Sequence, residues 1–345
     1  DSELEFALKS DILLINLESE AEMLRLEQIA QKLNKPARIS IRVNPNVDAK
    51  THPYISTGLN ENKFGVSIET ARKMYIYAKK SKFLNPVGIH FHIGSQLTDI
   101  SPICDAAKIV SDLLRELRAL EIDIKFFDVG GGIGIRYEDE KQIVLYDYAQ
   151  GILKSLSGLD VTIVCEPGRF ITGAAGVFLT RVLYEKQNCG KRFVIVDGAM
   201  NDLIRPSLYG AHHAIEIVSA LESINLDEAG ASEVNLGGRG SDQINGSCAD
   251  EKILGGVNLA AASLCDVVGP ICESGDFLAK GVSLPSLKSG DLLAIKSAGA
   301  YGFSMSSNYN TRCRAAEVAV YDGQDRLIRK RESFDDLIAL EKDLV

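Results

Sequence analysis

Positive charge is scarce in this sequence. Its 345 residues include 38 lysines and arginines against 47 aspartates and glutamates, which gives a formal net charge of −9 at pH 7. Partners rich in phosphate, such as nucleic acids and anionic membranes, require a cationic surface on the protein that binds them. The charge balance therefore argues against a nucleic-acid or membrane partner and favours a small molecule.

Long apolar runs are missing as well. No stretch approaches the roughly 18 to 20 residues that span a bilayer. The opening residues, DSELEFALKS, have neither the basic segment nor the apolar core of a secretory signal. With 46% hydrophobic and 25% charged residues, the chain is expected to be a cytoplasmic globular protein.

Motifs for disulfide and metal chemistry are also absent. The seven cysteines are an odd number, are widely scattered and form no Cys-x-x-Cys pair, so neither a disulfide framework nor a zinc knuckle is indicated. The five histidines include no His-x-x-x-His spacing. We therefore expect no metal ion.

The first half of the sequence alternates short apolar runs with amphipathic stretches. The expected strands lie within 11–17, 37–45, 87–95, 124–132 and 161–168, and the expected helices within 18–33, 67–81, 102–120 and 146–156. Apolar strands that are each followed by a helix predict a parallel sheet covered by helices, either as a barrel or as a doubly wound sheet. In both folds, chemistry gathers where the strands end.

The pattern changes after about residue 172. Strand-like runs follow one another without regular helices between them, which predicts a second, mostly antiparallel domain, and an amphipathic helix is expected at 333–344. No Ser/Gly/Pro-rich tether separates the halves, so we expect a boundary between domains 1–172 and 173–345. Residues 220–263 read as a surface loop or an insertion.

A glycine triplet, Gly130-Gly131-Gly132, follows the apolar run FFDV. Three glycines let the backbone approach an anion closely and present amide N–H groups to it. A dinucleotide fingerprint would need a third spaced glycine where Ile135 stands, and the Gly-Lys-Ser/Thr of a P-loop is absent. A generic phosphate site and a merely tight turn both remain open.

Glu166 ends another apolar run and is followed by a proline, a glycine and Arg169. A carboxylate fixed there can pair with a cationic heteroaromatic nitrogen, and the arginine can reach a phosphate or a substrate carboxylate. A plain salt bridge between the two residues is the alternative. His90 and His92 share one face of a strand, where they could be metal ligands, a stacking surface or buried hydrogen-bonded side chains.

Three further fragments are ambiguous when each is taken singly. IRPSLYG holds Arg205 and Tyr209, ICESGD holds Cys272 and Glu273, and AGAYG holds Tyr301. A cysteine beside an acid is a plausible proton donor, and a tyrosine between small residues could close over a flat ligand. Turn chemistry explains each fragment equally well.

Taken together and in order, six segments resemble the diaminopimelate decarboxylase family, pyridoxal 5′-phosphate (PLP) enzymes of fold-type III. The segments are HFHIGSQ, DVGGGIGI, CEPGRF, IRPSLYGAHH, VVGPICESGD and AGAYGFSMSSNYN. The resemblance implies a (β/α)8 barrel of the alanine-racemase type that binds PLP, partly present in 1–172, followed by a β-rich domain in 173–345. It also implies a homodimer whose active sites are shared between subunits.

The resemblance further implies roles for individual residues. His92 would stack on the cofactor ring, Glu166 would pair with its pyridine nitrogen, and Ser95, Gly131 and Gly132 would hold its phosphate. Gly168, Arg169 and Tyr301 would complete the cofactor site. Substrate would be bound by Arg169, Arg205, Tyr209, Glu273 and Tyr301, and Cys272 would be the catalytic proton donor.

Two departures from the family pattern stand out. The family's Schiff-base lysine lies in a Tyr-Ala-x-Lys-Ala-Asn-like segment on an early barrel strand, and no such segment occurs here. Lys9 matches nothing in that motif, so we expect a chain whose first barrel units are missing. The second departure is 220–263, where the family has a shorter connection.

Three functions follow from these patterns. The first is PLP-dependent decarboxylation of meso-2,6-diaminopimelate to L-lysine and CO2. The second is a non-catalytic homologue that binds a decarboxylase subunit or a ligand, which the missing lysine favours. The third is another amino-acid decarboxylase or racemase of fold-type III.

Overall fold

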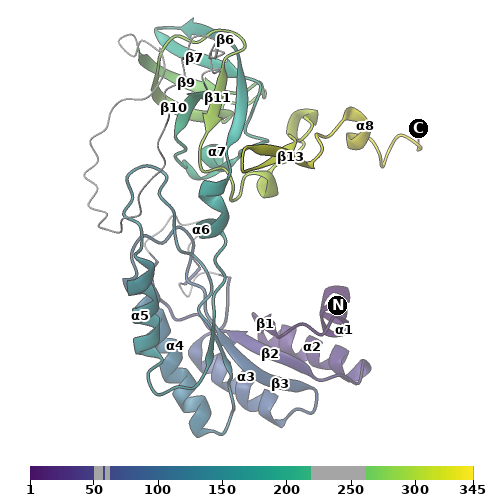
Figure 1. Ribbon diagram of the computed structural model, residues 1–345. Coiled ribbons are helices and arrows are strands. Elements are labelled where there is room, and N and C mark those ends of the chain that lie inside the picture. The colour runs from purple at the N-terminus through teal and green to yellow at the C-terminus, as the bar shows by residue number, and fades with distance from the viewer. Residues whose placement is uncertain (50–56, 59–62, 219–261, 345) are drawn as a thin grey trace, which may run out of the picture. The chain divides into compact units, whose positions relative to one another are not determined.

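A computed structural model of the protein describes residues 1–49, 57–58, 63–218 and 262–344 (Figure 1). The chain divides into two compact units, each described here by itself. The first unit is made of 1–177, 201–214 and 296–345, and the second of 178–200 and 215–295.

This division differs from the two domains expected at 1–172 and 173–345. Residues 201–214 and 296–345 group with the first unit although they come late in the chain. Packing, and not chain order, decides which unit a segment joins. Residues 220–261 of the expected insertion lie outside the described residues.

A five-stranded parallel sheet forms the centre of the first unit, in the strand order β1-β2-β3-β4-β5. The strands are β1 (Ile15–Leu17), β2 (Ala37–Arg42), β3 (Leu84–His90), β4 (Phe126–Asp128) and β5 (Thr162–Val164). The helices are α1 (Ser2–Lys9), α2 (Glu20–Lys32), α3 (Ile68–Lys80), α4 (Ser101–Ala119) and α5 (Leu145–Ser155). The expected alternation of strand and helix is confirmed. Within the described residues β1 and β5 each pair on one side only, so the sheet is open.

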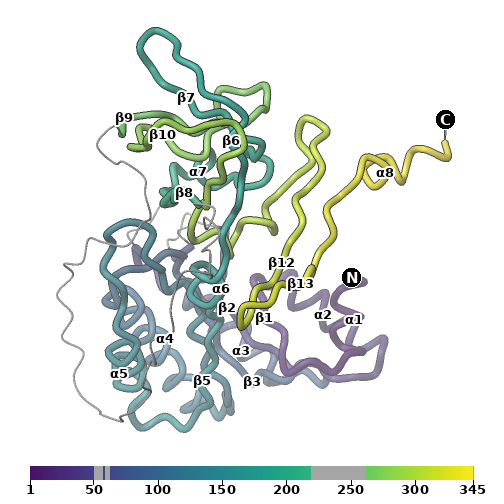
Figure 2. The backbone as a smooth tube through the Cα atoms, turned by 45° about the horizontal axis from the view of Figure 1, so that its top comes forward, coloured from purple at the N-terminus to yellow at the C-terminus, as the bar shows by residue number. Residues whose placement is uncertain are grey.

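The core of this unit lies between the sheet and its helices (Figure 2). Ile39, Ile41 and Ile89 from the strands are fully buried, and Phe91 packs edge-on against Phe127 with ring centroids 5.9 Å apart. Helix α4 buries the apolar positions of one face, namely Ile103, Ala106, Ala107, Val110, Leu113, Leu114 and Leu117. This spacing of three and four residues is the helical period that the sequence predicted.

Side-chain caps mark where two of these helices begin. Ser19 precedes α2, and its hydroxyl accepts a hydrogen bond from the Glu22 amide at 3.1 Å. Ser67 precedes α3 and accepts from the Thr70 amide at 3.1 Å. Each cap satisfies an amide that has no partner within the helix. Among the described residues, no helix combines the length and the apolar character needed to cross a bilayer.

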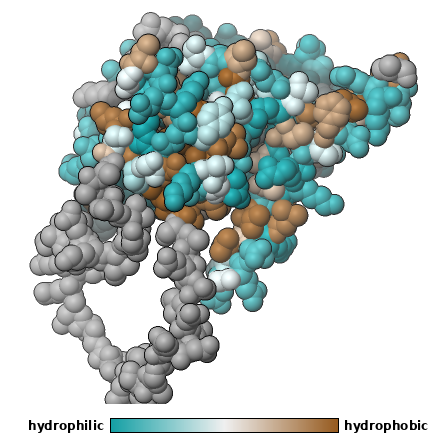
Figure 3. Space-filling view, turned by 90° about the horizontal axis from the view of Figure 1, so that it is seen from above, coloured by the Kyte–Doolittle hydropathy of each residue, from teal (hydrophilic) through white to brown (hydrophobic). Residues whose placement is uncertain are grey.

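A six-stranded sheet forms the second unit, in the order β10-β9-β7-β6-β11-β8. Its strands are β6 (Phe178–Asn188), β7 (Lys191–Val196), β8 (Ile215–Val218), β9 (Ser263–Val268), β10 (Phe277–Leu284) and β11 (Leu292–Ile295). Only β7 and β9 pair in parallel, and the other neighbours are antiparallel. The mostly antiparallel character expected from the sequence is confirmed. Apolar side chains also reach the surface among polar ones (Figure 3), and on β6 these include Leu183 and Tyr184.

The remaining elements of the first unit are short. They are α6 (Arg169–Thr172), the 3-10 turns at Gly173–Ala175, Phe303–Met305 and Tyr309–Thr311, α7 (Arg205–Tyr209), the hairpin β12 (Glu317–Tyr321) and β13 (Gln324–Arg329), and α8 (Phe334–Leu337). The helix expected at 333–344 is therefore a single turn. It has a capping box between Ser333 and Asp336, but Phe334 and Leu340 are exposed, so no packing sustains a longer helix.

Candidate active site

Three parallel strands end next to one another and form the centre of the candidate site. His90 is the last residue of β3 and pairs with Asp128, the last residue of β4. Beyond the strands, the Glu166 amide donates to the Gly130 carbonyl at 2.8 Å, so the pairing continues into the loops. The carboxyl ends of parallel strands bring His90, Asp128 and Glu166 together, as expected for this class of fold.

The glycine triplet is required by close contacts between these loops. Gly130 and Gly132 have φ of 66° and 109°, which other residues rarely adopt. A Cβ on Gly131 would collide with the Glu166 carbonyl oxygen, and one on Gly132 with the Gly94 carbonyl oxygen. The triplet thus lets three loops touch through their backbones.

His92 is a neutral, flat ring at this junction. Burial lowers its pKa to about 4, with the positive charge of Arg42 adding to the effect. Its Nδ1 accepts a hydrogen bond from the Gly131 amide at 3.2 Å. Because Nδ1 is the acceptor, the neutral ring carries its proton on Nε2. A neutral imidazole has an open face for stacking and no charge to repel a cationic ring.

Glu166 and Asp128 are two acids with different ionisation. The imidazole of His90, whose Nε2 lies 3.6 Å from Glu166 Oε2, lowers the pKa of Glu166, and the neighbouring Asp128 contributes. Burial raises the pKa of Asp128, and the charge of Glu166 raises it further. Asp128 therefore takes up a proton before Glu166 does, and Glu166 remains a carboxylate.

These groups also have the spacing of a metal site. One ligand atom each from His90, Asp128 and Glu166 lies within 4.8 Å of the others, and His90 Nε2 lies 3.6 Å from Glu166 Oε2. The absence of a metal ion, expected from the sequence, stays a prediction.

In the ion pairs of the described residues Glu166 pairs with His90, so the plain Glu166–Arg169 salt bridge considered above is wrong.

Arg169 connects the predicted phosphate and substrate groups. This arginine is 6% exposed, and its Nη2 donates to the Ser95 hydroxyl at 3.2 Å while Nη1 donates to the Tyr137 hydroxyl at 2.6 Å. Its guanidinium also lies 4.9 Å from the centre of the Tyr301 ring. Within the described residues no carboxylate lies within ion-pair distance of Arg169, so its charge is available to an anion.

Arg205 is a second buried guanidinium beside Tyr137. It is the first residue of α7, is 5% exposed, and lies 4.6 Å from the centre of the Tyr137 ring. Tyr209, the last residue of α7, interacts with Arg205 electrostatically. Burial lowers the pKa of Arg205, and the neighbouring Arg169 contributes. Two cations around one phenol ring favour an anionic ligand.

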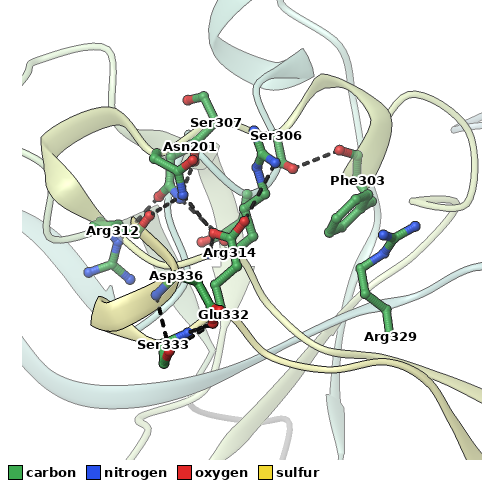
Figure 4. Close-up of polar contacts among 12 residues, drawn as sticks. Asn201, Phe303, Ser306, Ser307, Arg312, Arg314, Arg329, Glu332, Ser333 and Asp336 are labelled. Carbon is green, nitrogen blue, oxygen red and sulfur yellow. Dashed lines mark hydrogen bonds and ion pairs between the residues drawn. The ribbon is translucent and has the colours of Figure 1, made fainter. Parts of the chain in front are cut away.

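Tyr301 has an unusual backbone conformation, and the segment that follows it makes several hydrogen bonds. Its φ of 58° lies in the left-handed region, which a bulky residue seldom adopts, and such backbone strain often marks functional sites. The following segment is tied to Asn201, whose carbonyl accepts from the Ser307 amide at 2.9 Å and whose Oδ1 accepts from Arg312 at 3.2 Å. Glu332 accepts from the Arg314 amide at 2.8 Å (Figure 4).

Most of the predicted site residues lie in the first unit. They are His92, Ser95, Gly131, Gly132, Glu166, Gly168, Arg169, Arg205, Tyr209 and Tyr301. Contacts join His92 to Gly131, and Arg169 to Ser95 and to Tyr301. Their individual roles stay predictions.

Cys272 and Glu273 lie in the second unit. Both side chains are exposed, in a turn between β9 and β10. Asp276 shapes this turn, because its carboxylate accepts hydrogen bonds from the Ile271 and Met200 amides, each at 2.7 Å. The acid of the segment ICESGD that is buried is thus Asp276.

Sequence reasoning missed four residues of the site region: Asp128, Tyr137, His213 and Asn201. Asp128 carries a signal in the sequence, since it is the last residue of an apolar strand and only Val129 separates it from the glycine triplet. The other three lie in loops, and only the folded chain brings them to the site.

The site's chemistry fits a phosphorylated aromatic cofactor. The Nε atom of Arg169 is buried with no hydrogen-bond partner among the described residues, and the Ser95 hydroxyl lies beside it. A fixed carboxylate and a neutral ring face lie at the adjoining strand ends. These groups together suit an anionic tail, an aromatic face and a cationic ring nitrogen.

Comparisons with known proteins agree with this chemistry. The sequence model described as "Pyridoxal-dependent decarboxylase, pyridoxal binding domain" matches residues 1–173. Diaminopimelate decarboxylase of Campylobacter jejuni is 60% identical over 341 residues, which are 99% of this chain and 75% of that protein. The crystal structure of diaminopimelate decarboxylase from Helicobacter pylori complexed with L-lysine is 51% identical. It superposes with a TM-score of 0.86 and is matched over 100% of this chain and 77% of that one.

Proposed function

This chain belongs to the diaminopimelate decarboxylase family, and from that premise we propose which of its residues carry the reaction. It is a PLP-dependent carboxy-lyase of lysine biosynthesis that converts meso-2,6-diaminopimelate to L-lysine and CO2. Its fold is the PLP-binding barrel with a β-rich domain that the sequence predicted. When bound, PLP supplies a conjugated ring that accepts the electrons left on the substrate carbon as CO2 departs.

Glu166 is the residue on which the proposal depends. Its carboxylate would hold a proton at the pyridine nitrogen of the cofactor, because a fixed anion favours the cationic form of that nitrogen. The lowered pKa of Glu166, caused first by its interaction with the His90 imidazole, keeps the carboxylate charged. The position of Glu166 beside His90 and Asp128 is the observation that supports this role.

Other residues of the first unit would hold the cofactor. His92 would stack on its ring, and Ser95 with Gly131 and Gly132 would bind its phosphate. Gly168, Arg169 and Tyr301 would complete that site. The support for this assignment is the neutral, flat ring of His92 and the hydrogen bond from Arg169 to Ser95.

Substrate recognition needs both signs of charge. The substrate carries a carboxylate and an ammonium at its far end, and we assign the carboxylate to Arg205, with Arg169, Tyr209 and Tyr301 nearby. Glu273 would bind the ammonium. Cys272 would return a proton to the carbon that lost CO2.

We also propose a homodimer in which Cys272 and Glu273 reach into the active site of a partner copy. The exposure of both side chains supports this arrangement. The cytoplasmic location and the absence of nucleic-acid and membrane partners stay the predictions made from composition.

Glu166→Ala tests the proposal in the complete, cofactor-loaded protein. Its kcat should fall about 100-fold or more, the scale of losing one preorganised electrostatic contact in a transition state. Lysine and CO2 formed from meso-diaminopimelate are the readout. Glu121→Gln is the matched control, because Glu121 forms an exposed ion pair with Lys79.

Turnover by Glu166→Ala equal to wild type would contradict the role of Glu166. Wild-type protein that binds cofactor but releases no CO2 from any amino acid would support the non-catalytic alternative. Release from a different amino acid would support another fold-type III decarboxylase.

A further inference from the structure

We propose that His213 is a positioning residue for Arg205: its imidazole holds the guanidinium in the orientation that binds the far carboxylate of the substrate. The inference rests on the proposed function, since it takes Arg205 as a substrate-binding residue. It adds that a second residue, His213, orients the guanidinium of Arg205.

The hydrogen bonds around His213 define its tautomer. His213 Nδ1 lies 2.8 Å from the Lys296 carbonyl oxygen, and Nε2 lies 2.8 Å from Arg205 Nη1. A carbonyl only accepts and a guanidinium only donates, so Nδ1 carries the proton and Nε2 accepts from Arg205. His213 is 1% exposed and Arg205 is 5% exposed, so this chain of bonds is shielded from water.

Tyr137 fixes the guanidinium from a second side. Arg205 lies over the face of the Tyr137 ring at 4.6 Å, and the Tyr137 and His213 rings meet edge-on with centroids 5.3 Å apart. The guanidinium therefore donates to His213 through Nη1 and also lies over the ring of Tyr137. The Nε atom of Arg205 is buried and has no partner among the described residues, so a donor remains for a ligand.

A neutral acceptor is the appropriate partner for a cation that must bind an anion. Burial lowers the pKa of His213 to about 4, and Arg205, His212 and Arg169 all add to that lowering, whereas the Lys296 carbonyl opposes it. A carboxylate in the same place would form an ion pair with Arg205 and compete with the substrate. The neutral imidazole orients the guanidinium and leaves its charge for the ligand.

Two ligands distinguish this role from general support of the fold. Loss of CO2 from one end of diaminopimelate leaves L-lysine, which keeps the far carboxylate, whereas 1,5-diaminopentane has no carboxylate. In the complete, cofactor-loaded protein, His213→Leu should weaken L-lysine binding about 10-fold or more, the scale of a lost charge-assisted hydrogen bond. Binding of 1,5-diaminopentane should be unchanged. Both affinities are measured by calorimetry.

Steady-state kinetics should show the same separation. Arg205 binds a part of the substrate that does not react, so His213→Leu should raise KM for meso-diaminopimelate more than it lowers kcat. His213→Gln keeps an acceptor for Arg205 and a donor for the Lys296 carbonyl, and it should restore L-lysine affinity to within about 3-fold of wild type.

The neighbouring histidine provides a matched control. His212 is part of the same dipeptide but lies 4.0 Å from Glu138 with 42% of its side chain exposed, so His212→Leu should bind both ligands as wild type does. Melting curves of every variant establish that each is folded.

Unchanged L-lysine affinity in folded His213→Leu would overturn the inference. So would an equal loss for both ligands, or no recovery in folded His213→Gln. Wild-type protein that binds neither ligand would overturn the proposed function and this inference with it.

Discussion

Asp128 and Glu166 lie near the ends of neighbouring strands. Their surroundings shift the pKa values of the two carboxyl groups in opposite directions. Burial raises the pKa of Asp128, while the interaction with the His90 imidazole lowers the pKa of Glu166. Acids whose surroundings move their pKa values apart can hold different protonation states at one pH. We therefore expect Asp128 to be the protonated acid, able to donate a hydrogen bond to Glu166, and Glu166 to be the anion of the pair.

Substitution of Asp128 tests this division. Asparagine keeps a donor for Glu166 and an acceptor for the Gly130 amide, which donates to Asp128 at 2.9 Å. Asp128→Asn should therefore retain kcat within about 10-fold of wild type, whereas Asp128→Ala, which loses both bonds, should lose about 100-fold or more. Equal losses in the two variants would show that Asp128 does not act as a donor to Glu166.

Site residues could be predicted where they follow a recognisable apolar strand in the sequence. Glu166 and the glycine triplet directly follow apolar strands, and parallel strands place such positions at one edge. Tyr137 and His213 were missed. Tyr137 lies in no motif, and although His213 ends the segment IRPSLYGAHH, nothing in the sequence distinguishes it from His212. Arg205 contacts His213, eight residues further on, and Tyr137, which comes much earlier in the chain.

Helices and strands were predicted well where a face is buried, because burial requires apolar residues at a regular spacing. The four helices expected in the first half, observed as α2 to α5, and all five parallel strands overlap the expected ranges, since each has one face or both faces in the core. The helix at 333–344 was overpredicted. Its apolar residues have helical spacing, but Leu340 is 91% exposed, so these side chains have no core to pack against.

Strand β3 contains a proline that should weaken it. Pro86 cannot donate a backbone hydrogen bond, and the register between β2 and β3 shifts between Ile39 and Ser40. Tyr75, fully buried on α3, inserts at this point: its hydroxyl donates to the Gly88 carbonyl at 2.7 Å and accepts from the Ile41 amide at 3.2 Å. The phenol replaces pairing that the strands lose at the shift.

Tyr75→Phe should therefore destabilise the first unit. Removing the hydroxyl leaves a buried amide and a buried carbonyl without their partner, which costs about 1–3 kcal/mol of unfolding free energy. Denaturant unfolding measures the loss. Tyr77→Phe is the matched control, because its hydroxyl donates to Glu27 in a solvent-exposed hydrogen bond that should matter little. A Tyr75→Phe midpoint equal to that of the control would contradict the bridging role.

On the scale of the whole molecule, two buried imidazoles connect stability to pH. Burial lowers the pKa of His92 and of His213 to about 4 from 6.5. Below pH 6.5 the unfolded chain binds protons at these positions and the folded chain does not. Their contribution therefore leaves stability unaffected above that pH and reduces it as pH falls toward 4.

His213→Gln isolates one of these imidazoles. Glutamine does not titrate, so the unfolding free energy of wild type should fall more steeply between pH 6.5 and 4.5 than that of the variant, by up to about 2–3 kcal/mol. Urea unfolding of both proteins across this range is the measurement. Parallel pH profiles would show that His213 is not held neutral by the fold.

The assignment of Glu166 to the cofactor's ring nitrogen is tested most directly by removing that nitrogen. Wild type and Glu166→Gln are each loaded with PLP or with an analogue in which carbon replaces the ring nitrogen, and decarboxylation of meso-diaminopimelate is measured. The substitution should lower kcat about 100-fold or more with PLP and have little effect with the analogue. The same loss with both cofactors would contradict the pairing of Glu166 with that nitrogen.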